Sequence, residues 1–164
     1  MASRVQVLVP IAIAAIIVGI AGMLSLPSDI KLESVEFPRG MIKLDDVVLE
    51  VQIADTDPRR VRGLMFQEQL PFDQGMLLVF DSPNKRSIWM LNVQFSLDIF
   101  WIDGDGKVSH IEKNVPPCKT AVETVTCPSY KGGGKDAQYV LEVTAGFVDK
   151  NNITTDSVLE IISI

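Results

Sequence analysis

The chain has 164 residues, 47% of them hydrophobic, and its 15 Lys and Arg residues are outnumbered by 21 Asp and Glu residues. The resulting net charge of −6, without a basic run interleaved with aromatic residues, argues against a nucleic-acid partner and against adhesion to anionic lipid headgroups. Apart from an apolar N-terminal segment, the length suits one domain with its own core.

Residues 7–24 form a run of 18 residues with no polar side chain, and their neighbours extend it to residues 5–26. A run of about 20 apolar residues spans a bilayer as a helix, so we expect residues 1–26 to be a membrane anchor. A secretory signal that is cleaved is the alternative, because Arg4 supplies its charged start. Arg4 before the run and acidic residues after it place the rest of the chain outside the cytoplasm.

After the anchor we expect a tether and first strand region over residues 27–45 and a β-rich domain over residues 46–164. Alternating apolar residues predict a strand over 47–53. A short helix should follow, because Asp55, Thr56 and Asp57 offer a cap, Pro58 suits a first helical position, and Gly63 suits its end after Arg62.

The remaining elements are short and separated by turn residues. We expect strands or strand-like segments at 76–80, 95–102, 107–112, 138–143 and 158–162, with turns at 81–84 and 103–106. Many short strands with little helical periodicity indicate an all-β domain with one or two short helices, built as a β-sandwich or barrel.

Asp98 is a lone carboxylate in a strand that is apolar on both faces. Burying it without a partner costs several kcal/mol at least. The structural interpretation, which we favour, pairs Asp98 with Arg62 or Arg86. The functional interpretation makes it a general base or ligand anchor, with Asn92 supplying a hydrogen bond.

The sequence gives little support for a metal site or for a nucleophilic cysteine. His110 is the only histidine, which excludes sites with two or three histidine ligands, so we expect no metal and no cofactor. Cys118 and Cys127 are too far apart for a redox CxxC pair and too few for a zinc cage. Outside the cytoplasm they should form a disulfide, although a free thiolate beside His110 is the alternative.

Two Gly-containing segments imitate known motifs. Asp103–Gly106 superficially resembles the end of a calcium loop, but no acidic ligand stands at the loop's twelfth position, so a turn is favoured. Lys131–Lys135 lacks the GK[ST] pattern of a phosphate loop, and we interpret it as a mobile loop that could act as a lid.

Ordered blocks of residues from about 46 to 164 resemble the domain of unknown function family 192. The blocks include Arg62–Met65, Gly75–Leu77, Trp89–Met90 with Asn92, Leu97–Ile99, Pro117–Cys118, Cys127–Pro128 with Tyr130, and Tyr139–Glu142. The resemblance implies a jelly-roll-like β domain, often secreted or membrane-anchored, and it implies no activity. Val93 and Ser96 stand where relatives usually have threonine and a nearby proline.

Two classes of function remain. The favoured one is an extracytoplasmic binding or envelope-associated module whose cleft, lined by Arg62, Trp89, Asn92, Asp98 and Tyr130, takes a small ligand, glycan or partner protein. The alternative is a hydrolase or isomerase that uses Asp98 as acid or base and Arg62 as an anion clamp. No nucleophile elbow or HExxH pair supports the enzyme.

Overall fold

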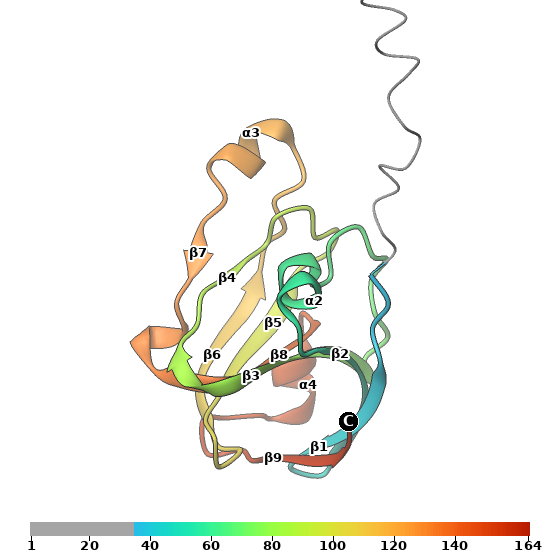
Figure 1. The fold of residues 1–164 in the computed structure, drawn as a ribbon, viewed down its shortest axis with the longest axis vertical. Coiled ribbons are helices and arrows are strands. Elements are labelled where there is room, and N and C mark those ends of the chain that lie inside the picture. Colours follow the sequence, from blue (N-terminus) through green and yellow to red (C-terminus); the bar gives the residue numbers. More distant parts are fainter. Residues whose placement is uncertain (1–34) are drawn as a thin grey trace, which may run out of the picture. The chain divides into compact units, whose positions relative to one another are not determined.

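The computed structural model describes residues 35–164, and these form a β domain around one large sheet (Figure 1). The predicted anchor, residues 5–26, lies outside the described residues. Among residues 35–164, no helix combines the length and apolar character needed to cross a membrane.

Seven strands make the main sheet, in the order β6-β5-β8-β3-β2-β1-β9. Their bounds are β1 (Arg39–Leu44), β2 (Val47–Ala54), β3 (Gln74–Lys85), β5 (Leu97–Ile102), β6 (Val108–Val115), β8 (Asp136–Thr144) and β9 (Leu159–Ser163). Only β2 and β3 pair in parallel, and every other neighbouring pair is antiparallel. The short strands β4 (Ile88–Trp89) and β7 (Ser129–Tyr130) form a separate pair.

The helices are short. They are α2 (Asp57–Arg62), α3 (Ala121–Val125) and α4 (Phe147–Asn151), and a 3₁₀ turn, η1, covers Gly132–Gly134. The predicted helix is confirmed as α2: Thr56 is its N-cap, Pro58 lies in its first turn, and Gly63 ends it at a φ of 45°. That left-handed conformation suits a glycine.

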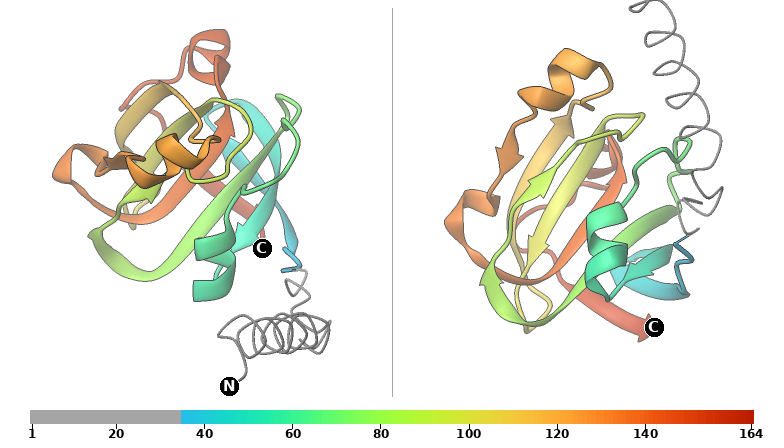
Figure 2. Two further views of the ribbon diagram at one scale, coloured as in Figure 1. Left: turned by 90° about the horizontal axis from the view of Figure 1, so that it is seen from above. Right: turned by 45° about the horizontal axis from the view of Figure 1, so that its top comes forward.

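The mainly β class is confirmed, but the predicted sandwich or barrel is replaced by one mixed sheet that does not close. The strongly curved sheet brings its two outer strands together at one end (Figure 2). There, the amide of Val108 donates to Ser157 and the amide of Leu159 donates to Gly106. Since these contacts join only the starts of β6 and β9, they make no continuous ladder.

The predicted turn at residues 81–84 is wrong. Those residues continue strand β3, and its pairing with β8 shifts register between Val79 and Asn84. A bulge of this kind bends a strand without ending it, which explains why turn-forming residues occur inside a strand. The turn at Asp103–Gly106 is confirmed: the Asp103 carboxylate accepts the amides of Asp105 and Lys107.

Each face of the sheet carries its own apolar core. The inner core lies against α4 and includes Phe100, Leu141, Val143, Phe147 and Val148. The outer core lies under α2, β4, β7 and the connections around them, and includes Leu64, Leu78, Ile88, Ile99 and Trp101. Because both faces are covered, a polar side chain on a central strand is buried whichever way it points.

Candidate functional site

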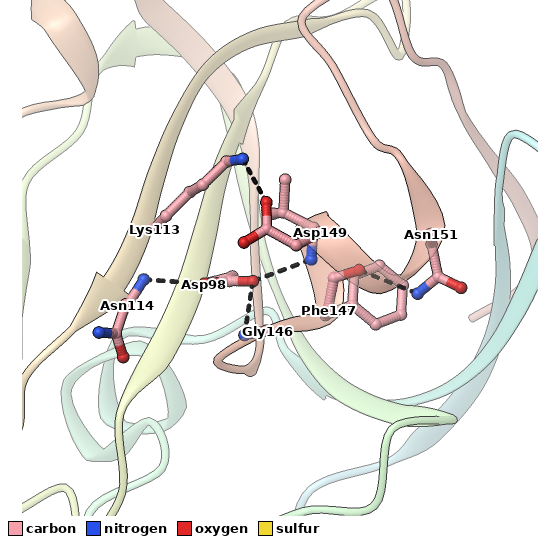
Figure 3. A network of polar contacts seen from close by, with 8 residues as sticks. Asp98, Lys113, Asn114, Gly146, Phe147, Asp149 and Asn151 are labelled. Atoms are coloured by element: carbon pink, nitrogen blue, oxygen red, sulfur yellow. Dashed lines mark hydrogen bonds and ion pairs between the residues drawn. The ribbon is translucent and has the colours of Figure 1, made fainter.

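Asp98 is buried on the inner face, with 1% of its surface exposed, and it contacts backbone amides (Figure 3). One carboxylate oxygen accepts the amide of Asn114 at 2.8 Å. The other accepts the amides of Gly146 at 3.0 Å and Val148 at 2.9 Å, the N-cap and second position of α4. Asp98 therefore holds β5, β6 and the start of α4 together.

The local backbone explains this arrangement. The β5–β6 ladder shifts register opposite Asp98, and Asn114 there has a φ of 51°, so its amide turns toward the carboxylate. Gly146 has a φ of 92°, a conformation that side chains rarely adopt, and it starts α4 beside β5. The predicted ion pair of Asp98 with Arg62 or Arg86 is wrong, because three backbone amides stabilise the carboxylate instead.

The two arginines are engaged elsewhere. The Arg62 guanidinium lies 5.0 Å from the centre of the Phe66 ring. Arg86 donates to the carbonyls of Ser82 and Ala137 and lies 3.9 Å over the Phe80 ring. Since Asp98 faces the other core, neither arginine is available to it.

A cavity of about 270 Å³ opens on the outer side of the sheet, and we call it the α2–β4 cavity. Apolar side chains make most of its wall. The lining residues are Asp57, Arg60, Val61, Arg62, Gly63, Leu64, Met65, Leu78, Phe80, Ser87, Ile88, Trp89, Leu91, Val93 and Glu142.

Two of the five predicted cleft residues, Arg62 and Trp89, line the α2–β4 cavity. The other three, Asn92, Asp98 and Tyr130, do not. Asn92 takes a left-handed conformation, and its backbone bonds to Phe66 and Cys118, so it shapes the chain next to the cavity.

Tyr130 pairs with Ile88 between β7 and β4 and packs against the outer core. Burial, followed by the nearby Glu112 carboxylate, raises the pKa of its hydroxyl. Tyr130 thus supports the strand that carries Trp89.

Glu142 is the site residue that the sequence analysis missed. It lies on β8 with 5% of its surface exposed, between Met76 of β3 and Ile99 of β5 in the sheet register. Among residues 35–164 no donor pairs with its carboxyl, whereas every fully enclosed side-chain oxygen or nitrogen there has a partner. Its oxygens must therefore reach the cavity, and burial raises the pKa of Glu142 to about 7.

Arg60 also lines the cavity, but three of the five N–H donors of its guanidinium already have partners. It donates to the carbonyls of Asp55 and Val79 and pairs with the Asp57 carboxylate at 2.6 Å. Within the described part of the chain, Arg62 has no such hydrogen bond or ion pair. The α2–β4 cavity thus combines an unpaired acid, an unpaired base and an apolar wall.

The remaining candidates lie elsewhere. Cys118 and Cys127 form the predicted disulfide, with Cα atoms 5.9 Å apart. His110 lies 3.0 Å from the Glu112 carboxylate and packs edge-on against Trp101. In residues 35–164, no group of three or more His, Cys, Asp or Glu side chains could hold a metal ion.

The Lys131–Lys135 segment, interpreted from sequence as a mobile loop, forms the η1 turn. Gly132 is buried there, and a Cβ atom at this position would lie 2.4 Å from the Trp101 ring. This close approach explains the glycine, and the segment does not line the cavity.

Two solved structures share this fold. One, from Sinorhizobium meliloti 1021 and called a "putative transcription regulator", is 27% identical, covers 77% of this chain and 96% of its own, and gives a TM-score of 0.67. The other, a protein of unknown function from Novosphingobium aromaticivorans DSM 12444, is 21% identical, covers 79% and 89%, and gives a TM-score of 0.63.

A comparison with curated proteins gives no match. The family of proteins described as DUF192, Uncharacterized ACR, matches residues 40–161, which include both cores, the disulfide and the whole α2–β4 cavity. The resemblance found in the sequence is thereby confirmed, and the chain belongs to the DUF192 family.

Proposed function

We propose that this protein is a binding module that takes a small molecule into its α2–β4 cavity. The observation that carries the proposal is Glu142, a buried carboxyl that reaches the cavity and has no hydrogen-bonding partner within residues 35–164. Its oxygens reach the cavity and no protein donor within residues 35–164, so the group is open to a hydrogen bond from a molecule that enters the cavity.

The wall of the cavity supports the same function. Leu78, Ile88 and Val93 offer apolar surface, and Trp89, with 51% of its surface exposed, offers an aromatic face to a ligand. A mostly apolar cleft with a few convergent polar groups is typical of small-molecule sites. Its volume lies near the lower end of about 300–1,000 Å³ for such sites, which favours a metabolite-sized ligand.

A ligand screen tests the binding function. We expect a melting-temperature increase of the full-length chain with a subset of small metabolites, because a ligand that binds only the folded state stabilises it. The Trp89→Ala variant should lose that increase while keeping its own melting temperature, since Trp89 is half exposed. A matched control is Phe72→Ala, an exposed aromatic residue outside the cavity, which should keep the response.

We further propose that the module is membrane-anchored through residues 5–26 and lies outside the cytoplasm. The apolar run supports the anchor, and the Cys118–Cys127 disulfide supports an oxidising compartment. Full-length protein should sediment with membranes and resist carbonate extraction. Recovery of a soluble form beginning near Ser25 would instead identify a cleaved signal.

Acid–base catalysis is a second candidate function, and Glu142 favours it over Asp98. A carboxyl with a pKa raised to about 7 by burial, in an open cavity, suits proton transfer near neutral pH. Asp98 is enclosed by backbone amides and does not line the cavity. Recovery of chemically changed ligand from wild type, but not from Glu142→Gln, would support catalysis, whereas unchanged ligand from both supports binding alone.

DNA binding, which the name of the Sinorhizobium structure suggests for that protein, has little support here. The chain carries a net charge of −6, and phosphate contacts need a basic surface. We therefore retain small-molecule binding as the proposed function.

A further inference from the structure

The α2–β4 cavity has one buried acid in its lining, Glu142. Glu142 belongs to a row across the sheet in which Gln52 pairs with Met76, Met76 with Glu142, and Glu142 with Ile99. Gln52 is engaged in two amide hydrogen bonds with Gln67, of 2.7 and 3.0 Å. The row ends at Arg39, which pairs with Glu50, and at Glu112, which is itself an acceptor. No side chain of the row donates to the Glu142 carboxyl, so this acceptor is open to a ligand in the cavity.

The wall of the same cavity carries a base. Arg62 is the last residue of α2 and is half-buried. Within residues 35–164 its guanidinium makes a cation–π contact with the ring of Phe66 and no hydrogen bond or ion pair. A ring face leaves the N–H groups at the edge of the guanidinium free to donate. Arg60, on the same helix, differs from Arg62, since two carbonyls and the Asp57 carboxylate accept three of its five N–H donors.

The acid and the base do not pair with each other, although both line one cavity. Glu142 is on β8 and Arg62 is on α2, and apolar side chains of β3 and β4, including Leu78, Ile88 and Trp89, line the same cavity. Arg60 and Asp57 pair with each other, which leaves the cavity with one unpaired group of each sign and an apolar wall. Such a cavity is complementary to a molecule with the reverse charges and an apolar body.

We propose that the α2–β4 cavity binds a small zwitterion, whose ammonium group pairs with Glu142, whose carboxylate pairs with Arg62, and whose hydrocarbon body contacts Leu78, Ile88 and Trp89. This inference rests on the proposed binding function. Both pairs are charge-assisted, and the guanidinium can take a carboxylate with two parallel hydrogen bonds. A molecule that lacks either group leaves one charge of the cavity unpaired and is rejected for that reason.

Calorimetric titration of the full-length chain with straight-chain ω-amino acids, from glycine to ε-aminocaproate, tests the inference. One chain length should bind best, because the two charges of the cavity are fixed by the sheet and by α2. That compound is then compared with the alkylamine, the fatty acid and the primary alcohol of the same length. We expect the zwitterion to bind at least about tenfold more tightly than each of the three, the effect of one charged hydrogen bond.

Two variants test which residue binds each charged group of the ligand. Glu142→Gln should abolish the preference for the zwitterion over the fatty acid, and Arg62→Gln should abolish its preference over the alkylamine. Arg59→Gln is the matched control, because Arg59 belongs to α2 but bonds to Asp55 and Glu36 and does not line the cavity. Circular dichroism of each variant checks the fold.

Outcomes of this titration separate the inference from the proposed function. Equal or tighter binding of the alcohol, the amine or the fatty acid overturns the zwitterion and leaves a small-molecule site in place. Binding by none of the compounds overturns the zwitterion as well, and the broader ligand screen then decides the proposed function by itself. Unchanged selectivity in Glu142→Gln and Arg62→Gln would show that other residues hold the charges.

Discussion

Asp98 and Glu142 are buried carboxylates on the neighbouring strands β5 and β8, but they lie on opposite faces of the sheet and differ in their hydrogen bonds. In the register of these strands Asp98 is opposite Val143 and Glu142 is opposite Ile99, so the two side chains point to opposite faces. Asp98 accepts three backbone amides on the inner face. Glu142 has no partner within residues 35–164 and reaches a cavity on the outer face.

This difference in hydrogen bonding indicates a structural role for Asp98 and a ligand-binding role for Glu142. A carboxylate that satisfies backbone donors fixes the elements that carry them and has no capacity left for a ligand. A carboxyl that reaches a cavity without a protein donor keeps its hydrogen-bonding capacity for a ligand, and buried groups with a raised pKa are concentrated at functional sites. The inner face therefore holds the fold together, and the outer face provides the binding site.

The largest effect should come from Asp98→Ala, which leaves the amides of Asn114, Gly146 and Val148 without their acceptor. We expect a loss of about 3–5 kcal/mol in the free energy of unfolding, measured by urea denaturation. Asp105→Ala, at an exposed position of the 103–106 turn, is the control and should change the stability by less than about 0.5 kcal/mol. A loss below about 1 kcal/mol in Asp98→Ala would contradict its structural role.

Glu142 should make stability fall as the pH rises. Burial raises the pKa of this carboxyl from 4.5 to about 7, so the folded protein keeps a proton that the unfolded chain releases earlier. Its stabilising contribution is therefore complete below pH 4.5 and is lost as the pH rises to about 7. The loss corresponds to about 3 kcal/mol.

The Glu142→Gln variant isolates this contribution, since glutamine has a similar shape and does not titrate. Between about pH 4 and pH 8, we expect the free energy of unfolding of wild type to fall by about 3 kcal/mol relative to the variant. Parallel pH profiles of the two proteins would show that Glu142 does not change its protonation on folding.

These two residues also show how far the sequence alone could lead. Both are carboxylates between two apolar residues of a strand, and this pattern correctly predicted that Asp98 is buried. The same pattern at Glu142, between Leu141 and Val143, was the available signal for the site residue that was missed. Burial follows from the local pattern, because a strand that is apolar on both faces has to lie inside.

The partners of these carboxylates could not be predicted in the same way. The amides that bind Asp98 come from a register shift in β6 and from the start of α4, 48 and 50 residues along the chain for Gly146 and Val148. The α2–β4 cavity likewise combines α2, β3, β4 and β8. Helix α2 itself was predictable, since Pro58 and Gly63 mark its ends through local chemistry. Of the predicted cleft residues, Arg62 and Trp89 line the cavity, whereas Asn92 and Tyr130 do not.

The disulfide should stabilise the outer face selectively. Cys118 belongs to the outer core and Cys127 packs against it. Replacing both by serine should cost about 2–3 kcal/mol, the chain-entropy value for so short a loop. Hydrogen exchange should show faster exchange for the amides of β4 and β7, with the amides of Gly146 and Val148 still protected. Equal loss of protection on both faces would mean that the two cores unfold as one unit.

The smallest effect should come from Asp149→Ala, which removes an exposed charge of α4, whereas Asp98→Ala removes the buried acceptor at the start of that helix (Figure 3). Asp149 pairs with Lys113 at 2.7 Å, but the two side chains are 77% and 53% exposed. Water already solvates both charges, so the pair should contribute about 0.5 kcal/mol, and about 1 M salt should remove most of it. Urea denaturation of wild type and variant at low and high salt measures this difference. Asp98→Ala should keep its full cost in the same salt, since its hydrogen bonds are shielded from ions. A salt-insensitive loss of several kcal/mol in Asp149→Ala would show that α4 depends on its exposed charge as much as on the buried one.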